Sequence, residues 1–278
     1  MREIPVRTVV DAVGDACIRA NIELGADVVE ALARAVDHEE SEVGRDILKK
    51  LLKNARIAKA EKIPICQDTG VAVLFVELGQ ETVVTGDLYQ ALEDGVRKGY
   101  EEGFLRKSVC DPFTRKNTGD NTPIIVHLDL VPGDGLKIWV VPKGGGSENM
   151  SRLFMLPPAA GWEGVKENIL QTVIEAGPNP CPPTIIGVGI GGNFEQSAIL
   201  AKRSLLRPLG TSNPDPRLNP MEQELLTEIN RTGIGPQGLG GRITSLAVHI
   251  LMMPCHIASL PLAVNIQCHA SRHVEIVL

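Results

Sequence analysis

The six cysteines are the residues most able to do chemistry, and no two of them form a C-x-x-C pair. This spacing excludes thioredoxin-like, zinc-ribbon and ferredoxin-like sites. Cys66, Cys181 and Cys268 lie in segments that predict loops or ends of elements, whereas Cys17 and Cys110 are predicted to be inert. Because free cysteine packs well as a small apolar residue, burial in the core is the alternative for each thiol. We expect free thiols or metal ligands, as disulfides are rare in a reducing cytoplasm.

Two other side chains could bind anions or move protons. Arg106 is predicted near the end of a helix, where a solvated cation beside the helix C-terminus is the alternative role. His256 lies within an apolar run beside Cys255, so it is either a buried core histidine or a proton donor with a tuned pKa.

The glycine-rich segments do not predict a nucleotide site. Residues 187–192 match G-x-G-x-x-G, but the acidic residue expected about twenty positions later is missing. We predict a turn there, which either offers N–H groups to an anion or is purely structural. Residues 143–147 and 235–241 do not have the spacing of a phosphate-binding loop.

Composition limits the class of partner. The chain of 278 residues carries a net charge of -6 and only 3% aromatic residues, so nucleic acid and membrane surfaces are not expected partners. The N-terminal residues lack the basic and apolar regions of a signal peptide, and we expect a cytoplasmic protein. The apolar stretch 243–267 is interrupted by histidines and prolines, which predicts a buried core segment.

Hydrophobic periodicity predicts the elements that position these residues. Helices are expected over 6–36, 41–61, 86–107 (opened by Asp87), 162–176, 194–206 and 220–232, and strands over 71–78 and 184–188. A β-hairpin is expected from 123–131 and 136–142 around a turn at 132–135. Because strands and helices do not alternate regularly, we predict an α+β fold. It would be a single domain over 1–278, in which a helical N-terminal portion (1–62) packs on a mixed sheet.

Several motifs together make the sequence similar to one enzyme family. The chain resembles the alpha subunit of the two-subunit class I (iron-sulfur) fumarate hydratases, a family that includes L-tartrate dehydratase. The resemblance rests on CQDTG (66–70), DPFTRKNTGDNTP (111–123), PKGGGSENMS (142–151), CPPTIIGVGIGG (181–192), NPDPRLNPMEQELLTEIN (213–230), GIGPQGLGG (233–241) and PCHIASLPLAVNIQCHASRH (254–273).

The resemblance implies a 4Fe-4S cluster held by Cys66, Cys181 and Cys268, which leaves one iron without a protein ligand. Such an iron can act as a Lewis acid toward a carboxylate and the leaving hydroxyl of a 2-hydroxy acid. Thiolate ligands suit iron-sulfur chemistry better than magnesium or calcium.

The resemblance also assigns roles around a small dicarboxylate substrate. Gln67, Asp68, Arg106 and the backbone of Gly145 would bind it, while Asp68 and His256 would be the catalytic residues. Asp68 would transfer a proton or orient the base, and His256 would donate a hydrogen bond or a proton.

Family members with one long chain carry further site residues in a C-terminal half, and this sequence ends at Leu278. We therefore expect a beta subunit that completes the active site, in a dimer of alpha-beta pairs. The expected reaction is the hydration of fumarate to L-malate. The alternatives are an L-tartrate dehydratase alpha subunit, or a cofactor-free binding subunit with buried cysteines.

Overall fold

The computed structural model describes residues 2–278, and its chain divides into two compact units. The first unit contains residues 2–24, 55–145 and 272–278, and the second contains 25–54 and 146–271. Each combines helices with a mixed sheet, which confirms the predicted α+β class. The assignment of 1–278 to one family domain stays a prediction. None of the described helices is both long and apolar enough to cross a membrane.

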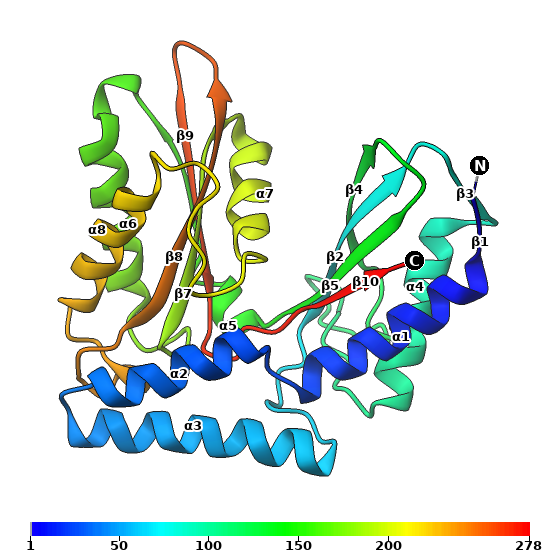
Figure 1. The fold of residues 1–278 in the computed structure, drawn as a ribbon, viewed down its shortest axis with the longest axis horizontal. Coiled ribbons are helices and arrows are strands. Elements are labelled where there is room, and N and C mark those ends of the chain that lie inside the picture. The colour runs from blue at the N-terminus through cyan, green and yellow to red at the C-terminus, as the bar shows by residue number, and fades with distance from the viewer. Residues whose placement is uncertain (1) are drawn as a thin grey trace. The chain divides into compact units, whose positions relative to one another are not determined.

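The first unit places two helices on one face of a four-stranded sheet (Figure 1). The helices are α1 (Val6–Ile22) and α4 (Leu88–Glu102), and the strand order is β10-β5-β2-β4. These strands are β2 (Val71–Gly79), β4 (Ile125–Val131), β5 (Leu136–Lys143) and β10 (Val274–Val277). A separate parallel pair joins β1 (Arg2–Pro5) to β3 (Thr82–Thr85). As predicted, Asp87 caps α4, because its carboxylate accepts the Gln90 N–H at 3.0 Å.

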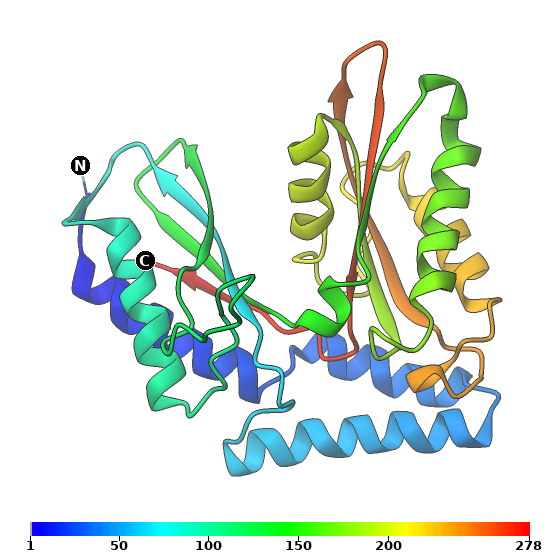
Figure 2. The same ribbon diagram turned by 180° about the vertical axis from the view of Figure 1, so that it is seen from behind.

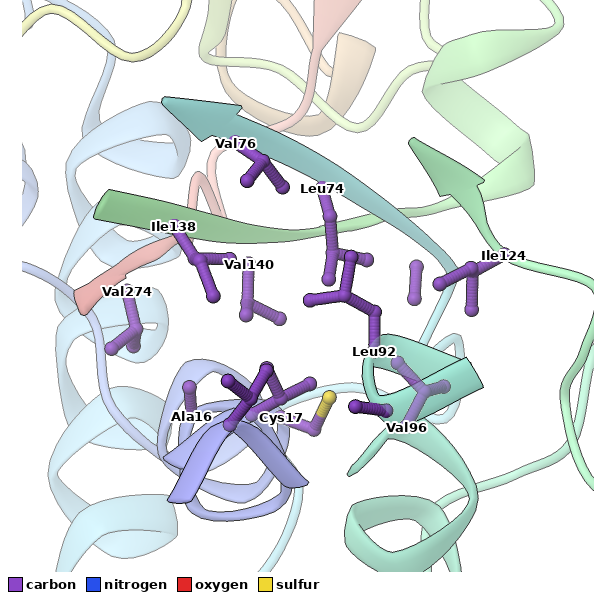
Figure 3. Packing of buried hydrophobic residues seen from close by; sticks show 14 of the residues in the cluster. Ala16, Cys17, Leu74, Val76, Leu92, Val96, Ile124, Ile138, Val140 and Val274 are labelled. Atoms are coloured by element: carbon purple, nitrogen blue, oxygen red, sulfur yellow. The ribbon is translucent and has the colours of Figure 1, made fainter. Parts of the chain in front are cut away.

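Small residues allow α1 and α4 to pack closely over this sheet. A Cβ on Gly99 would lie 2.6 Å from the Gly14 carbonyl oxygen and 2.7 Å from the Cys17 Cβ, so only glycine fits. Cys17 lies in the apolar core between the helices and the sheet, beside residues such as Leu74 and Val96 (Figure 3). Burial raises the pKa of its thiol to about 12, which confirms that Cys17 is an inert core residue.

The predicted β-hairpin of β4 and β5 is wrong. Strand β2 lies between them, parallel to β4 and antiparallel to β5. The connection from β4 to β5 instead crosses the end of β2, where the Gly79 and Glu81 N–H groups donate to the Gly135 and Gly133 carbonyls at 2.8 and 2.9 Å. The chain does reverse direction at 132–135, as the turn residues indicated. However, β2 is an apolar strand with neighbours on both edges, and its insertion between β4 and β5 cannot be read from the local sequence.

Helix α4 ends five residues before the predicted boundary. Gly103 follows its last residue, and Phe104 has φ +51°, which turns the chain out of the helix. Arg106 therefore lies in the following loop instead of in the last helical turn.

The second unit is a sheet covered by helices on both faces. Its strand order is β6-β9-β7-β8, from β6 (Arg152–Leu156), β7 (Thr184–Gly192), β8 (Ser245–Cys255) and β9 (Leu260–Gln267). Helix α7 (Phe194–Ser204) covers one face, while α6 (Gly161–Ala176) and α8 (Asn219–Asn230) cover the other (Figure 2). Helix α2 (Ala26–His38) and residues 42–54 of α3 (Glu42–Glu61) also belong to this unit, as does most of the short α5 (Gly145–Glu148). The short 3₁₀ segments are Pro158–Ala160 and Pro236–Gly238.

Residues 187–192 form part of strand β7 and are not the predicted turn. A Cβ on Gly189 would lie 2.0 Å from the Ser197 carbonyl oxygen, so this glycine lets α7 approach the strand closely. The N–H of Gln196, in the first turn of α7, is satisfied by the Asn193 side chain at 2.9 Å. Of the two proposed roles for residues 187–192, the purely structural one therefore accounts for the glycines.

The apolar segment 243–267 is only partly the buried core that we predicted. Residues 247–250 and 261–267 are buried, but residues 252–258, around the β8–β9 turn, are exposed. The turn extends beyond the helices that cover the sheet (Figure 1).

A buried histidine makes stability depend on pH. His249 is 2% exposed, and burial, helped by Arg207, lowers its pKa to about 4. Because the unfolded chain binds this proton near pH 6.5, stability should fall as pH drops below that value, by about 2 kcal/mol between pH 7 and pH 5. Chemical denaturation at pH 7 and pH 5 should show that the free energy of unfolding falls less in His249→Gln than in the parent protein. The same change at exposed His38 should leave the loss unchanged, and equal losses in all three proteins would contradict this assignment.

Candidate active site

The loop Cys66–Gly70 enters β2 and is fixed by side chains from several parts of the first unit. Buried Tyr100 donates its hydroxyl to the Thr69 and Gly70 carbonyls at 2.6 and 3.0 Å. Buried Asn121 donates its amide to the Gly70 carbonyl at 3.2 Å, and Arg272 donates to the Asp68 carbonyl. These bonds hold the loop backbone, so the side chains of residues 66–68 are presented from a fixed frame.

The carboxylate of Asp68 is held by groups that the sequence assigned to the same site. Its Oδ1 accepts the Gly70 N–H at 3.1 Å, and its Oδ2 accepts the Gly145 N–H at 2.8 Å. The Arg106 guanidinium lies 3.6 Å from Oδ1 and has a side chain that is 56% exposed. Asp68, Arg106 and Gly145 are therefore brought together, although they are distant in the sequence.

Cys66 and Gln67 complete this group. The Cys66 thiol lies 3.4 Å from the Gln67 Oε1 and accepts the Asp68 N–H at 3.4 Å. Arg106 is positioned through its carbonyl, which accepts the Thr69 hydroxyl at 2.7 Å. A thiol, a carboxylate and an accessible guanidinium thus surround one short loop. This combination can bind a metal and a carboxylate substrate next to each other.

Cys181 and Cys268 are brought together by backbone contacts in the second unit. The His269 N–H, next to Cys268, donates to the Cys181 carbonyl at 3.4 Å, and the His269 Nδ1 lies 3.0 Å from the same oxygen. Cys181 has φ +56°, an uncommon conformation for a residue with a side chain. Such backbone strain is found at functional sites more often than elsewhere.

His256 is exposed at the β8–β9 turn, which excludes the buried-core interpretation. Its Nδ1 accepts the Ala258 N–H at 3.1 Å. In the neutral ring the proton is therefore on Nε2, so that nitrogen is a hydrogen-bond donor. The donor role of His256 stays a prediction.

The other cysteines lie in different settings. Cys110 was predicted to lie in the core, and this prediction is wrong. It is half-buried in an irregular loop and pairs with Asn117 through a single β-bridge. Cys255 is exposed, and its thiol donates to the Ser259 carbonyl at 3.2 Å.

The three predicted ligands fit an iron-sulfur cluster by their chemistry. Cys66, Cys181 and Cys268 are free thiols in loops. Cys181 is exposed, and the other two are intermediate in burial. Cys66 belongs to the first unit and the other two to the second. No three His, Cys, Asp or Glu side chains among residues 2–278 form a preassembled metal site. Neither unit contains all three thiols, so that finding is expected for this ligand set.

Sequence reasoning missed three residues that hold the loop at this site, namely Arg272, Tyr100 and Asn121. Arg272 lies in the CHASRH segment but was given no role, and it is 5% exposed with Nε and Nη1 buried and without hydrogen-bond partners. The useful signal would have been its position four residues after Cys268. Tyr100 and Asn121 gave no comparable signal, because their contacts with the loop depend on the fold.

Comparison with known proteins gives a consistent result. A family model described as fumarate hydratase (Fumerase) matches residues 10–277. The putative L(+)-tartrate dehydratase subunit alpha of Methanocaldococcus jannaschii is 42% identical over 270 residues, which cover 94% of both chains. The L(+)-tartrate dehydratase subunit alpha of Escherichia coli (strain K12) is 34% identical over 250 residues, which cover 88% of this chain and 82% of the relative.

Proposed function

Because the chain belongs to the fumarate hydratase (Fumerase) family of hydro-lyases, we propose that it is the alpha subunit of a two-subunit iron-sulfur enzyme. The proposed reaction is the reversible hydration of fumarate to L-malate. The observation that carries the proposal is the Asp68 carboxylate, which contacts Gly70, Gly145 and Arg106, in a loop where the Asp68 N–H donates to the Cys66 thiol. A dicarboxylate hydro-lyase needs a carboxylate-binding cation, a proton-transfer group and a Lewis acid, and these residues can supply or hold all three.

Arg106 is the residue best suited to bind a substrate carboxylate. Its Nη2 lies 3.6 Å from the Asp68 carboxylate, which is longer than a good hydrogen bond, and its Nε donates to the Ser108 hydroxyl at 3.4 Å, so most of its donors remain available. A bidentate pair with a carboxylate would fix both position and orientation. Gln67, whose amide adjoins Cys66, would bind the other polar groups of the substrate.

Dehydration of a 2-hydroxy acid removes a proton from one carbon and hydroxide from the next. Asp68 would accept the proton or orient the base that accepts it. His256 would give a proton or a hydrogen bond to the departing hydroxyl through Nε2. Hydration uses the same groups in the opposite direction.

Cys66, Cys181 and Cys268 would hold the 4Fe-4S cluster. When bound, its iron without a protein ligand would supply Lewis-acid polarisation of the substrate hydroxyl. Chain connectivity supports this grouping, because Cys268 stands only four residues before Arg272, which bonds to the Asp68 carbonyl.

We propose that a beta subunit completes the site, in a cytoplasmic dimer of alpha-beta pairs. The relatives are named as alpha subunits. In addition, His256 is exposed beside Ile257, which is 92% exposed, and near Met252 and Met253, which are 43% and 38% exposed. A proton donor works best when water is excluded. A partner covering this apolar turn would exclude it.

L-tartrate dehydration is the second candidate. It would use the same residues with a substrate that has one more hydroxyl, and the names of the relatives favour it. The residues of this chain bind features common to both substrates, namely a carboxylate and a hydroxyl.

Turnover by the assembled pair separates these candidates. The chain should be produced anaerobically with and without a family beta subunit, reconstituted with iron and sulfide, and assayed with L-malate, fumarate and L-tartrate. We expect activity only in the pair. Strong tartrate dehydration with negligible malate dehydration would replace the first candidate by the second. Full turnover by this chain alone would contradict the requirement for a partner.

A further inference from the structure

The most unusual group near the candidate site is the guanidinium of Arg272. The residue is 5% exposed. Among residues 2–278, no Asp or Glu side chain forms an ion pair with it. Its Nη2 donates to the Asp68 carbonyl, but the buried Nε and Nη1 have no hydrogen-bond partner. Burying a cation in this way is costly unless an anion and hydrogen-bond acceptors compensate for the lost water.

Another largely buried arginine shows what compensation looks like. The Nη2 of Arg207 lies 2.6 Å from the carboxylate of Glu222, which is itself 5% exposed. Both arginines have an unpartnered Nε, but only Arg207 has a carboxylate. The difference indicates that the folded first unit leaves a positive charge at Arg272 for an anion that its own side chains do not provide.

Arg272 contacts the loop that carries Cys66. Its single protein bond is to the carbonyl of Asp68, two residues after Cys66, and the Asp68 N–H donates to the Cys66 sulfur. Cys268 precedes it by four residues. A cysteine that binds metal is a thiolate, so metal binding at Cys66 would place negative charge on the loop that Arg272 holds.

We propose that Arg272 is a positioning residue whose guanidinium is the buried counter-ion of the Cys66 thiolate and of the cluster that it would hold. Arg272 has two functions in this proposal: it fixes the Cys66–Gly70 loop through the Asp68 carbonyl, and it offers Nε–H and Nη1–H to anionic sulfur. This inference rests on the proposed function, since it concerns the same cluster. Hydrogen bonds to the sulfurs and nearby charge are known determinants of cluster affinity and reduction potential.

The apoprotein provides a test that does not need activity. Without a cluster the Arg272 charge is uncompensated, so Arg272→Met should leave the melting temperature of the apoprotein unchanged or raise it by roughly 2–4 °C. Arg207→Met is the matched control, and it should lower the melting temperature because it leaves the buried Glu222 unpaired. A clearly lower melting temperature of Arg272→Met would mean that the arginine only stabilises the loop, and would overturn the proposal.

Iron retention tests the pairing itself. Reconstituted Arg272→Met should lose iron to a chelator about 10–100-fold faster than the parent protein, and its cluster should have a more negative reduction potential, whereas Arg272→Lys, which keeps the charge, should recover most of both properties. Arg207→Lys, which keeps a cation beside Glu222, should retain iron normally. Normal iron retention with a raised KM in Arg272→Met would assign the charge to a substrate carboxylate instead, and would overturn the proposal. If the parent protein also binds no iron, the proposed cluster fails as well, so the two failures are distinguishable.

Discussion

Each of the variants Cys66→Ser, Cys181→Ser and Cys268→Ser should reduce bound iron from about four atoms per chain to fewer than about one after anaerobic reconstitution. Turnover by the assembled pair should fall to background in all three. The physical reason is that a serine hydroxyl is a poor, hard ligand for iron-sulfur chemistry, so losing one of three thiolates removes the anchorage of the cluster. Iron analysis and visible absorption spectra measure the first effect directly.

The remaining cysteines provide matched controls. Cys17→Ala, Cys110→Ser and Cys255→Ser should each keep the full iron content, because the Cys17 thiol is buried in the core and the other two thiols are not among the predicted ligands. Alanine is the better choice at Cys17, since a serine hydroxyl would be buried there without a partner. Iron retained in all three ligand variants, or lost equally in the controls, would contradict the ligand assignment.

Local chemistry made many features predictable from the sequence. Helical periodicity and the Asp87 cap predicted α4, and apolar β-rich runs predicted β2 and β7. The loop position of Cys66, Cys181 and Cys268 also followed from the flanking prolines and polar residues. These features depend on residues within a few positions of one another.

Features that depend on distant residues were not predictable in the same way. The insertion of β2 between β4 and β5 requires pairing across about fifty residues, and the turn at 132–135 indicated a hairpin instead. Likewise, the exposure of His256 depends on how far β8 and β9 extend beyond their helices. At the site, Arg106 and Gly145 were assigned by resemblance. The hydrogen bond from Gly145 to Asp68 was visible only in the fold.

Replacing Asp68 with Asn should reduce kcat about 10²–10⁴-fold while the iron content stays normal. Asn keeps the size of the side chain and an acceptor for the Gly70 N–H, but it cannot take a proton at neutral pH. If the Asn oxygen accepts the Gly70 N–H, its amide nitrogen would face the Gly145 N–H. Two hydrogen-bond donors would then repel each other where the parent protein has a hydrogen bond. Steady-state kinetics of the assembled pair, with iron analysis of the same samples, would measure both quantities.

Asp111→Asn is the matched control for this experiment. Asp111 is also an exposed-loop carboxylate that accepts backbone N–H groups, from Phe113 at 3.0 Å and Thr114 at 2.6 Å, but it lies outside the predicted site. Its kcat should remain within about twofold of the parent value. The division between kcat and KM then identifies the role of Asp68, because loss of a proton-transfer group lowers kcat, whereas loss of uniform substrate binding raises KM alone. A raised KM with unchanged kcat in Asp68→Asn would therefore assign Asp68 to substrate binding and leave proton transfer to another residue.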